Sequence, residues 1–118
     1  MNVRNHVQLI GRFGMKPEVT QLDGGRRVAN IQMATSHYYT ASNGEKKEET
    51  EWHRVVAYGK FAETLEQRTD KGSEVMIHGT LRTRKWTDKS GTDHWTTEII
   101  VSHLFLMSNC KTPAESNG

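Results

Sequence analysis

Apolar residues alternate with polar ones over several short segments of this chain, and turn-forming residues separate those segments. Strand-like runs begin near Val7 and after Pro17, and they return over residues 28–34 and 52–58, with interruptions of the first run at Gly11 and Gly14. Alternation with a period of two is typical of strands that bury one face. The pattern therefore predicts a protein made mostly of β-strands.

Turn signals and polar stretches divide these runs. Asp23-Gly24-Gly25 predicts a hairpin turn, and residues 88–91 (Asp-Lys-Ser-Gly) predict the tip of another hairpin. Residues 40–51 are polar and rich in charge, with a turn signal at Asn43-Gly44, so we expect a solvated loop there. Alternation is cleanest over residues 75–81.

The only helix pattern lies over residues 60–71 and stops at Gly72, and a last apolar run starts near Trp95. The order is therefore three strands, a helix and a closing two-strand hairpin. It predicts an all-β class with one helix, namely an OB fold: a five-stranded Greek-key barrel with a helix between strands 3 and 4. A β-sandwich would need more strands. We expect one domain over residues 1–109 and a short disordered tail over residues 110–118.

Composition narrows the class of protein without choosing a function. The chain has 118 residues, 34% of them hydrophobic, which suits one domain with a modest core. Its net charge of +2 permits a nucleic-acid partner but does not require one. Cys110 is the only cysteine, which excludes an intrachain disulfide. There is no signal-peptide pattern and no apolar run of about 18 residues, so we expect a soluble, cytoplasmic protein.

The direction of side chains on two predicted strands carries the functional information. Alternate residues of a strand point to opposite faces. Over residues 52–58, one face carries Trp52, Arg54, Val56 and Tyr58, and the residues between them suit a core. In the strand after the helix, the outward face carries Arg82, Arg84 and Trp86, while Lys85 points the other way. Each of the two strands thus presents a tryptophan beside arginine.

Exposed aromatic side chains beside arginines suit the recognition of single strands. Bases stack on aromatic rings at about 1–3 kcal/mol each, and a positively charged groove follows the phosphates. Duplex DNA hides the faces of its bases, so such a surface selects unpaired strands. The alternative is that Trp52 and Trp86 pack in the core or between subunits. Because both are in register with arginines, we favour binding, and we expect Glu48, Glu49 and Glu51 to lie in a loop that repels DNA.

The sequence contains no clear motif for a metal site or for catalysis. His53, His78 and His103 lie on predicted strands and could meet in space, but no two histidines have the close spacing typical of a zinc site. Strand histidines more often form hydrogen bonds. No Gly-rich phosphate loop, nucleophile elbow or carboxylate pair is present. We therefore predict a non-enzymatic protein with no catalytic residues, no metal and no cofactor.

Two segments carry a specific pattern: residues 51–56 (Glu-Trp-His-Arg-Val-Val) and residues 81–88 (Leu-Arg-Thr-Arg-Lys-Trp-Thr-Asp). Shorter matching segments are residues 9–12, 17–19, 28–31, 58–60, 71–73 and 97–98. Together they resemble the bacterial single-stranded DNA-binding protein family. The resemblance covers roughly residues 3–107, nearly the whole predicted domain.

The resemblance implies an OB fold, usually in a homotetramer, with single-stranded DNA wrapped over its surface. It implies four base-stacking positions, which fall here on Tyr39, Trp52, Tyr58 and Trp86. The family often has tryptophan at the first of these positions and phenylalanine at the third. The resemblance also implies phosphate contacts at Arg54, Lys60, Lys71, Arg82, Arg84 and Lys85. Of these, Lys60 and Lys71 rest on the resemblance alone.

The predicted function is sequence-independent binding and coating of single-stranded DNA during replication, recombination and repair, in association with the nucleoid. Members of the family usually continue into a Gly/Gln-rich linker with an acidic tip that recruits replication and repair proteins. This sequence ends at Gly118 without such a tip, which is expected of either a truncated chain or a short form. The recruitment of replication and repair proteins by a tip is therefore not predicted here.

Alternative functions make different predictions. An OB-fold adaptor of a replication-restart assembly would bury Trp52 and Trp86 in a protein interface. A small metal-dependent hydrolase would use the strand histidines, although their spacing does not recommend it. A mitochondrial relative is a further alternative, against which the missing transit peptide argues.

Overall fold

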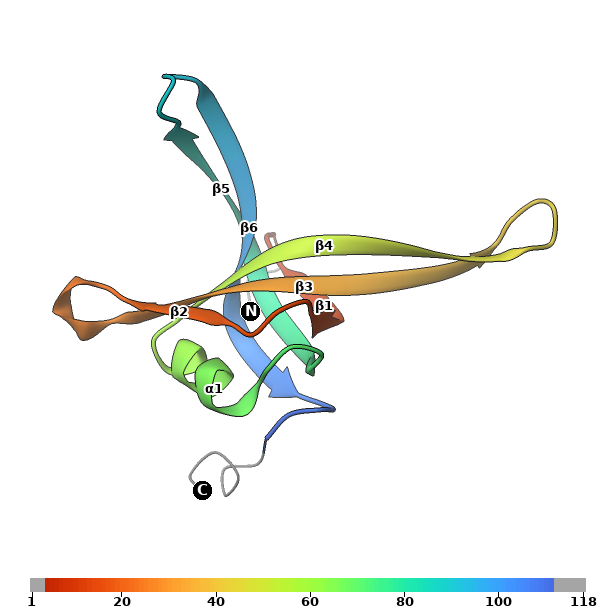
Figure 1. Ribbon diagram of the computed structural model, residues 1–118, viewed down its shortest axis with the longest axis horizontal. Coiled ribbons are helices and arrows are strands. Elements are labelled where there is room, and N and C mark those ends of the chain that lie inside the picture. Colours follow the sequence, from red (N-terminus) through yellow and green to blue (C-terminus); the bar gives the residue numbers. More distant parts are fainter. Residues whose placement is uncertain (1–3, 112–118) are drawn as a thin grey trace.

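Strands and one helix make up the fold, as the alternation of apolar residues predicts. The computed structural model describes residues 4–111. Along the chain the elements are β1 (Val7–Phe13), β2 (Glu18–Gln21), the 3-10 turn η1 (Asp23–Gly25), β3 (Arg27–Thr40), β4 (Lys46–Tyr58), α1 (Lys60–Arg68), β5 (Glu74–Thr87) and β6 (Asp93–Leu106) (Figure 1). The two predicted hairpin turns lie at η1 and between β5 and β6.

Five of the strands close into a barrel. β1 pairs with β5, β5 with β6, β4 with β3 and β3 with β1, all antiparallel, whereas β4 and β6 run parallel. The short β2 pairs with β3 beside this ring. In chain order, α1 lies between the third and fourth strands of the barrel. This arrangement is the OB fold, and the predicted fold class is confirmed.

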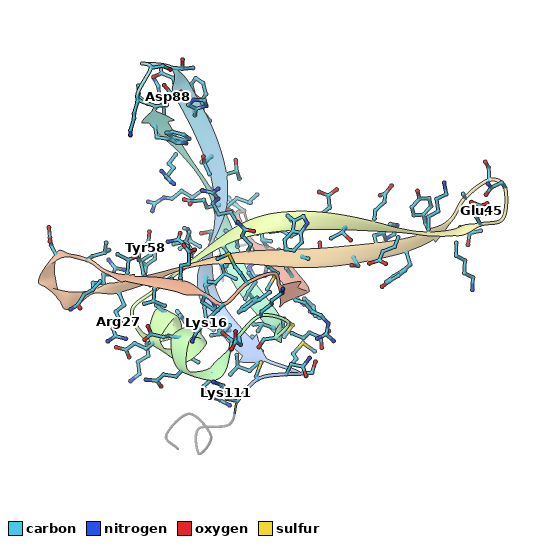
Figure 2. All side chains as sticks on the ribbon, in the orientation of Figure 1. Lys16, Arg27, Glu45, Tyr58, Asp88 and Lys111 are labelled. Carbon is cyan, nitrogen blue, oxygen red and sulfur yellow. The ribbon has the colours of Figure 1, made fainter. Side chains whose placement is uncertain are left out.

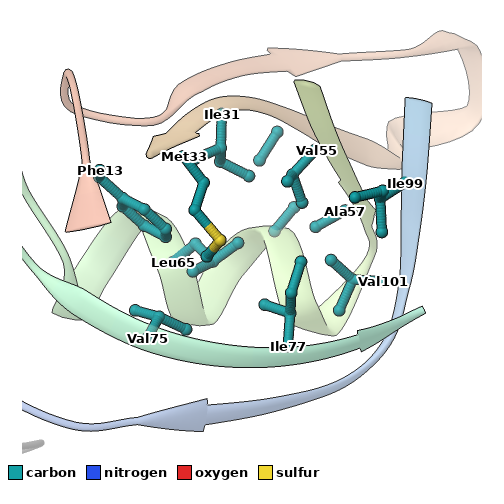
Figure 3. Packing of buried hydrophobic residues seen from close by; sticks show 12 residues of the cluster. Phe13, Ile31, Met33, Val55, Ala57, Leu65, Val75, Ile77, Ile99 and Val101 are labelled. Atoms are coloured by element: carbon teal, nitrogen blue, oxygen red, sulfur yellow. The ribbon is translucent and has the colours of Figure 1, made fainter. Parts of the chain in front are cut away.

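The core lies inside the barrel, and α1 covers it (Figure 3). Ala62 and Leu65 are three residues apart on α1, and both are buried on its barrel side. Burying a side chain such as Leu65 stabilises the fold by about 1.5–3 kcal/mol. The strands contribute Phe13, Ala29, Ile31, Met33, Val55, Ala57, Val75, Ile77, Ile99 and Val101. These are alternate residues of each strand, as a half-buried sheet requires.

Two glycines allow strands to approach closely where the barrel closes. A Cβ atom at Gly11 would lie 2.4 Å from the carbonyl oxygen of Ala34, and one at Gly79 would lie 2.3 Å from the carbonyl oxygen of Ile100. Backbone atoms of the neighbouring strand would have to move to admit either side chain. β1 therefore runs unbroken through Gly11. The predicted interruption there is wrong, because this glycine marks a close contact and not a turn.

Besides the shorter hairpin of β2 and β3, two long hairpins extend beyond the barrel, and Figure 1 shows them as ribbons pointing in different directions. We call them the β3–β4 arm (residues 34–52) and the β5–β6 arm (residues 81–97). The loop predicted over residues 40–51 is wrong, because β3 continues to Thr40 and β4 starts at Lys46. Both faces of this ribbon meet solvent, so no apolar alternation marks it in the sequence. The arms raise the radius of gyration to 16.4 Å, against about 13.5 Å for a compact domain of this length.

The segment after α1 connects the helix to the end of the domain. α1 ends at Arg68, short of the predicted end at residue 71, and both the amide and the hydroxyl of Thr69 donate to the carbonyl oxygen of Leu65. The amide of Lys111 donates to the carbonyl oxygen of Arg68 at 2.8 Å. The predicted tail beyond Lys111 lies outside the described residues. Within residues 4–111 no helix is long and apolar enough to cross a membrane.

Candidate nucleic-acid interface

Trp52 and Arg54 point outward from β4, as the alternation predicts. In the register of β3 and β4, Trp52 lies opposite Ala34 and Arg54 lies opposite Gln32. Trp52 is 60% exposed, yet its ring is not free to turn. A Cβ atom at Gly14 would lie 2.5 Å from Cζ3 of this ring, so the indole packs directly on the glycine backbone. One part of the ring is thus held by the barrel while the rest is open to a ligand.

Trp86 is held on the β5–β6 arm by two residues of β6. Its indole Nε1 donates to Oγ1 of Thr96 at 2.8 Å, and its ring stacks on His94 with the ring centroids 4.5 Å apart. The side chain nevertheless remains 42% exposed. Because these contacts restrict the indole before any ligand arrives, they reduce the entropy that stacking on it would cost.

Asp88 organises the tip of the same arm (Figure 2). Its carboxylate accepts hydrogen bonds from the Ser90 hydroxyl and from the amides of Ser90 and Thr92, and it lies 2.7 Å from Nε2 of His94. The Ser90 hydroxyl and, after it, the His94 ring lower the pKa of Asp88 to about 2. Since His94 also stacks on Trp86, the tip carboxylate helps to orient the tryptophan.

A groove lies on the outside of the barrel, on the strands that carry Trp52 and Trp86 and on their neighbours. It is lined by Val28, Asn30, Val56, Tyr58, Arg82, Arg84 and Glu98. β3, β4, β5 and β6 therefore all contribute to one concave surface. Val56 points outward, as predicted, but is only 3% exposed. Tyr58 is half-buried, with the Arg26 guanidinium carbon 4.7 Å from its ring centroid.

The cations of this surface differ in whether a carboxylate already neutralises them. Nε of Arg84 lies 3.1 Å from Oε1 of Glu98, whose side chain is only 7% exposed. Lys85 is also paired with a carboxylate, on the opposite face of the arm. Arg54 and Arg82 form no ion pair within the described residues. Arg82 in the groove and Arg54 beside Trp52 therefore carry charges that no carboxylate among the described residues neutralises, while Arg84 balances a buried charge.

Three predicted residues lie away from the groove. Trp52 pairs with Ala34, and Tyr39 pairs with Lys47. Ala34 and Tyr39 are an odd number of residues apart on β3, so Tyr39 lies on the face of the β3–β4 arm opposite Trp52. Lys60 is the first residue of α1, and Lys71 lies in the turn that follows this helix. Both lysines are exposed, and neither lines the groove. Of the predicted residues, Tyr58, Arg82 and Arg84 line the groove. Trp52 and Arg54 line a separate hollow beside Gln32, and Lys85 lies on the opposite face of the β5–β6 arm.

Sequence reasoning missed Tyr38 and Glu98. Tyr38 is 72% exposed and pairs with Glu48, on the same face of the β3–β4 arm as Trp52. Alternate residues before Trp52 on β4 share its face, and the hairpin turn at residues 43–44 relates them to Tyr38 on β3, so this signal would have identified Tyr38. Glu98 offered no such signal, because its burial beside Arg84 arises only when the strands close into a barrel.

The strand histidines meet only in part. His78 lies beside His6 and His103, with ring centroids 5.2 Å and 6.3 Å away. His53 instead lies on β4, with Nε2 2.8 Å from Oγ1 of Thr35. Among residues 4–111, no group of three or more His, Cys, Asp or Glu side chains is arranged to hold a metal ion.

Known proteins share both the sequence pattern and the barrel. Residues 4–107 match the model of the single-strand binding protein family. The Plasmodium falciparum SSB in complex with single-stranded DNA is similar at 34% identity and a TM-score of 0.81, over 92% of this chain and 100% of that one. A deletion mutant of the single-stranded DNA-binding protein from Thermus aquaticus has a TM-score of 0.77 at 23% identity, over 89% of this chain and 51% of that one. The second likeness bears on the fold alone.

Proposed function

This chain belongs to the single-strand binding protein family, and we propose that it binds and coats single-stranded DNA without sequence preference. The observation that carries the proposal is that Trp52 and Trp86 stand exposed on β4 and β5, two of the strands that line a groove holding Arg82. The action we propose is binding alone, with no chemical step. It serves DNA replication, recombination and repair in the cytoplasm, where coated strands neither re-anneal nor meet nucleases.

Stacking supplies the selectivity for unpaired strands. Each base that stacks on an aromatic side chain contributes about 1–3 kcal/mol, and every base has a face to offer. Trp52 and Trp86 are held by neighbouring groups and need little further ordering, whereas Tyr58 offers its ring from within the groove. Tyr39 serves a strand that continues onto the far face of the β3–β4 arm.

Phosphate contacts supply an attraction that depends on salt. Arg54 and Arg82 stand beside the aromatic rings without a carboxylate partner among the described residues, and Arg84 and Lys85 add charge from the β5–β6 arm. Lys60 guides the strand along the barrel beyond the groove, and Lys71 does so past the end of α1. Each basic side chain that contacts a phosphate releases the counterions of that phosphate. The logarithm of the binding constant therefore falls linearly with the logarithm of the salt concentration, by about 0.7 per contact for single strands.

We also propose that the protein forms a homotetramer. Ile10, Met76 and Phe105 lie side by side across β1, β5 and β6, on the outside of the barrel. Ile10 is 47% exposed and Phe105 is 45% exposed, and apolar surface of this kind supports association between subunits. Several linked DNA sites then hold one strand by multivalency.

The test of function is tryptophan fluorescence during titration with oligo-dT at low and high salt. We expect saturable quenching at low salt that weakens at high salt, with no quenching by a duplex of equal length. Replacing Trp52 and Trp86 by alanine should weaken binding by about 1–3 kcal/mol for each base unstacked. Unchanged fluorescence, with no gel shift beside it, would refute the proposal and favour the protein-binding adaptor.

The test of assembly is sedimentation equilibrium of a Phe105→Asp variant. A buried carboxylate in the subunit interface should dissociate the tetramer, because an unpaired charge is costly to bury. Thr20→Asp, at an exposed position of β2, is the matched control and should leave the mass unchanged. A Phe105→Asp protein with the mass of the parent would show that another face mediates assembly.

A further inference from the structure

The β5–β6 arm carries a second indole on the face opposite Trp86. In the register of the arm, Trp86 pairs with His94, while Lys85 pairs with Trp95. Adjacent positions of a strand point to opposite faces, so Trp95 projects away from the groove. The two tryptophans thus stand at nearly the same height along the arm, one on each side of a ribbon that is one sheet thick.

Trp95 is the more open of the two. It is 65% exposed, and within residues 4–111 its one ring contact is with Nζ of Lys85, 5.7 Å from the ring centroid. The same Nζ lies 3.3 Å from the carboxylate of Asp93. A large apolar ring on a solvated ribbon contributes little to the stability of this chain, since it leaves most of its surface in water. Most of the ring is therefore open to a ligand.

The surroundings of Trp95 suit a nucleotide better than an apolar protein surface. Between Trp95 and the barrel stand Thr83 and Thr97, whose hydroxyls are 3.0 Å apart. Leu81, beyond them, is exposed, but this polar pair separates it from the tryptophan. An isolated ring flanked by hydroxyl groups offers a stacking surface. The Lys85–Asp93 pair is exposed to solvent and contributes little, so Lys85 can exchange this carboxylate for a phosphate. The ring lacks the continuous apolar patch that a protein interface buries.

We propose that Trp95, with Lys85 beside it, is a further base-stacking site for single-stranded DNA, so that the strand contacts both faces of the β5–β6 arm. The proposal rests on the proposed function of the groove and extends it to a surface that faces away from the groove. A strand that has stacked on Trp86 continues around the arm and places a later base on Trp95. Only strands longer than those that fill the groove reach this second face.

Fluorescence of Trp95 alone is the direct test. In a Trp52→Phe/Trp86→Phe protein, both groove positions keep a ring that stacks, and Trp95 is the one remaining tryptophan of the three in the chain. We expect its emission to be quenched by long oligo-dT and to be protected from iodide. The complementary Trp95→Phe protein reports on the groove alone. Quenching in Trp95→Phe but not in the double variant would overturn this inference and leave the proposed function intact. An absence of quenching in both proteins would overturn both.

The length of the strand provides a second measurement. Across oligo-dT lengths from about 4 to about 16 nucleotides per OB fold, Trp95→Ala should leave the affinity for the shortest strands unchanged. It should weaken the binding of the longest about fivefold or more, as the loss of one stacked base requires. Thr20→Ala, at an exposed and uncharged position of β2 outside the β5–β6 arm, is the control and should leave the affinity unchanged at every length. Equal loss at every length, or a changed mass in sedimentation, would overturn the inference and assign Trp95 to the groove or to a protein contact.

Discussion

The β3–β4 arm and the β5–β6 arm are both two-stranded ribbons that leave the same barrel, and both carry aromatic side chains on both faces. Their charges differ. The β3–β4 arm has two lysines against four glutamates, whereas the β5–β6 arm has four arginines and lysines against two aspartates. Stacking is available on either arm, but attraction for the phosphates is concentrated on the second.

We infer from this difference that exposed aromatic area alone does not rank the candidate binding positions. Tyr38 is 72% exposed, more than any tryptophan, but its partner across the ribbon is Glu48. Trp86 is 42% exposed, yet it is held by a hydrogen bond and a stacked ring and stands two residues from Arg84. We expect prior ordering and neighbouring positive charge to outweigh exposed area.

The largest expected effect is therefore the gap between Trp86→Ala and Tyr38→Ala. Removing Trp86 should weaken binding to oligo-dT by about 1–3 kcal/mol, because one stacked base is lost where phosphate attraction is strongest. Removing Tyr38 should cost less than about 1 kcal/mol, at the lower limit for stacking. Fluorescence anisotropy of labelled oligo-dT measures both. Equal losses would show that charge does not separate the arms.

A smaller effect should follow from reversing one charge on the β3–β4 arm. Glu48 shares a face with Trp52, whereas Glu49 pairs with His37 on the opposite face. Glu48→Lys should tighten binding at low salt and steepen the salt dependence by about 0.7 in log–log slope, because one more phosphate releases its counterions. Glu49→Lys is the matched control and should change the slope less. A larger change in the control would place the strand on the other face of the arm.

The smallest effect concerns the tip of the β5–β6 arm. The pKa of Asp88 is lowered to about 2, chiefly by the Ser90 hydroxyl and then by His94. Because this value lies below the ordinary one of about 4, the carboxylate stabilises the tip above pH 4, and that contribution disappears as the pH falls towards 2. The carboxyl chemical shift of Asp88, followed by NMR, should titrate in this lower range. A midpoint near 4 would contradict the hydrogen-bonded tip.

Replacement of Asp88 tests at neutral pH whether its carboxylate holds the tip of the β5–β6 arm. Asp88→Ala removes the acceptor for the Ser90 and Thr92 amides and frees His94, so amide exchange at the tip should become faster. Affinity for oligo-dT should change little, since Trp86 keeps its hydrogen bond to Thr96. Lys89→Ala is the control with no side-chain bond removed. Unchanged exchange in Asp88→Ala would show that the tip is held in another way.

Much of the fold and part of the candidate site could be predicted from local pattern. Alternation placed Trp52 and Arg54 on one outward face, and the register of β3 and β4 confirms this. The same reasoning failed over residues 40–51, where a ribbon exposed on both faces has no reason to alternate. Tyr39 was named by the family resemblance alone, so no register related it to Trp52, and only the pairing of β3 with β4 shows that the two lie on opposite faces.

The sequence by itself determined that this protein is a strand-rich barrel, which residues point inward, and which aromatic and basic side chains share a strand. These properties depend on residues close together in the chain, and the alternation of apolar and polar residues with a period of two indicates them directly. Only the tertiary structure decided that Gly14 supports Trp52, that Glu98 is buried beside Arg84, and that Trp86 and Trp95 stand on opposite faces of one arm. Those relations join residues far apart in the chain or depend on pairing register, and they arise only once the strands close around a common core.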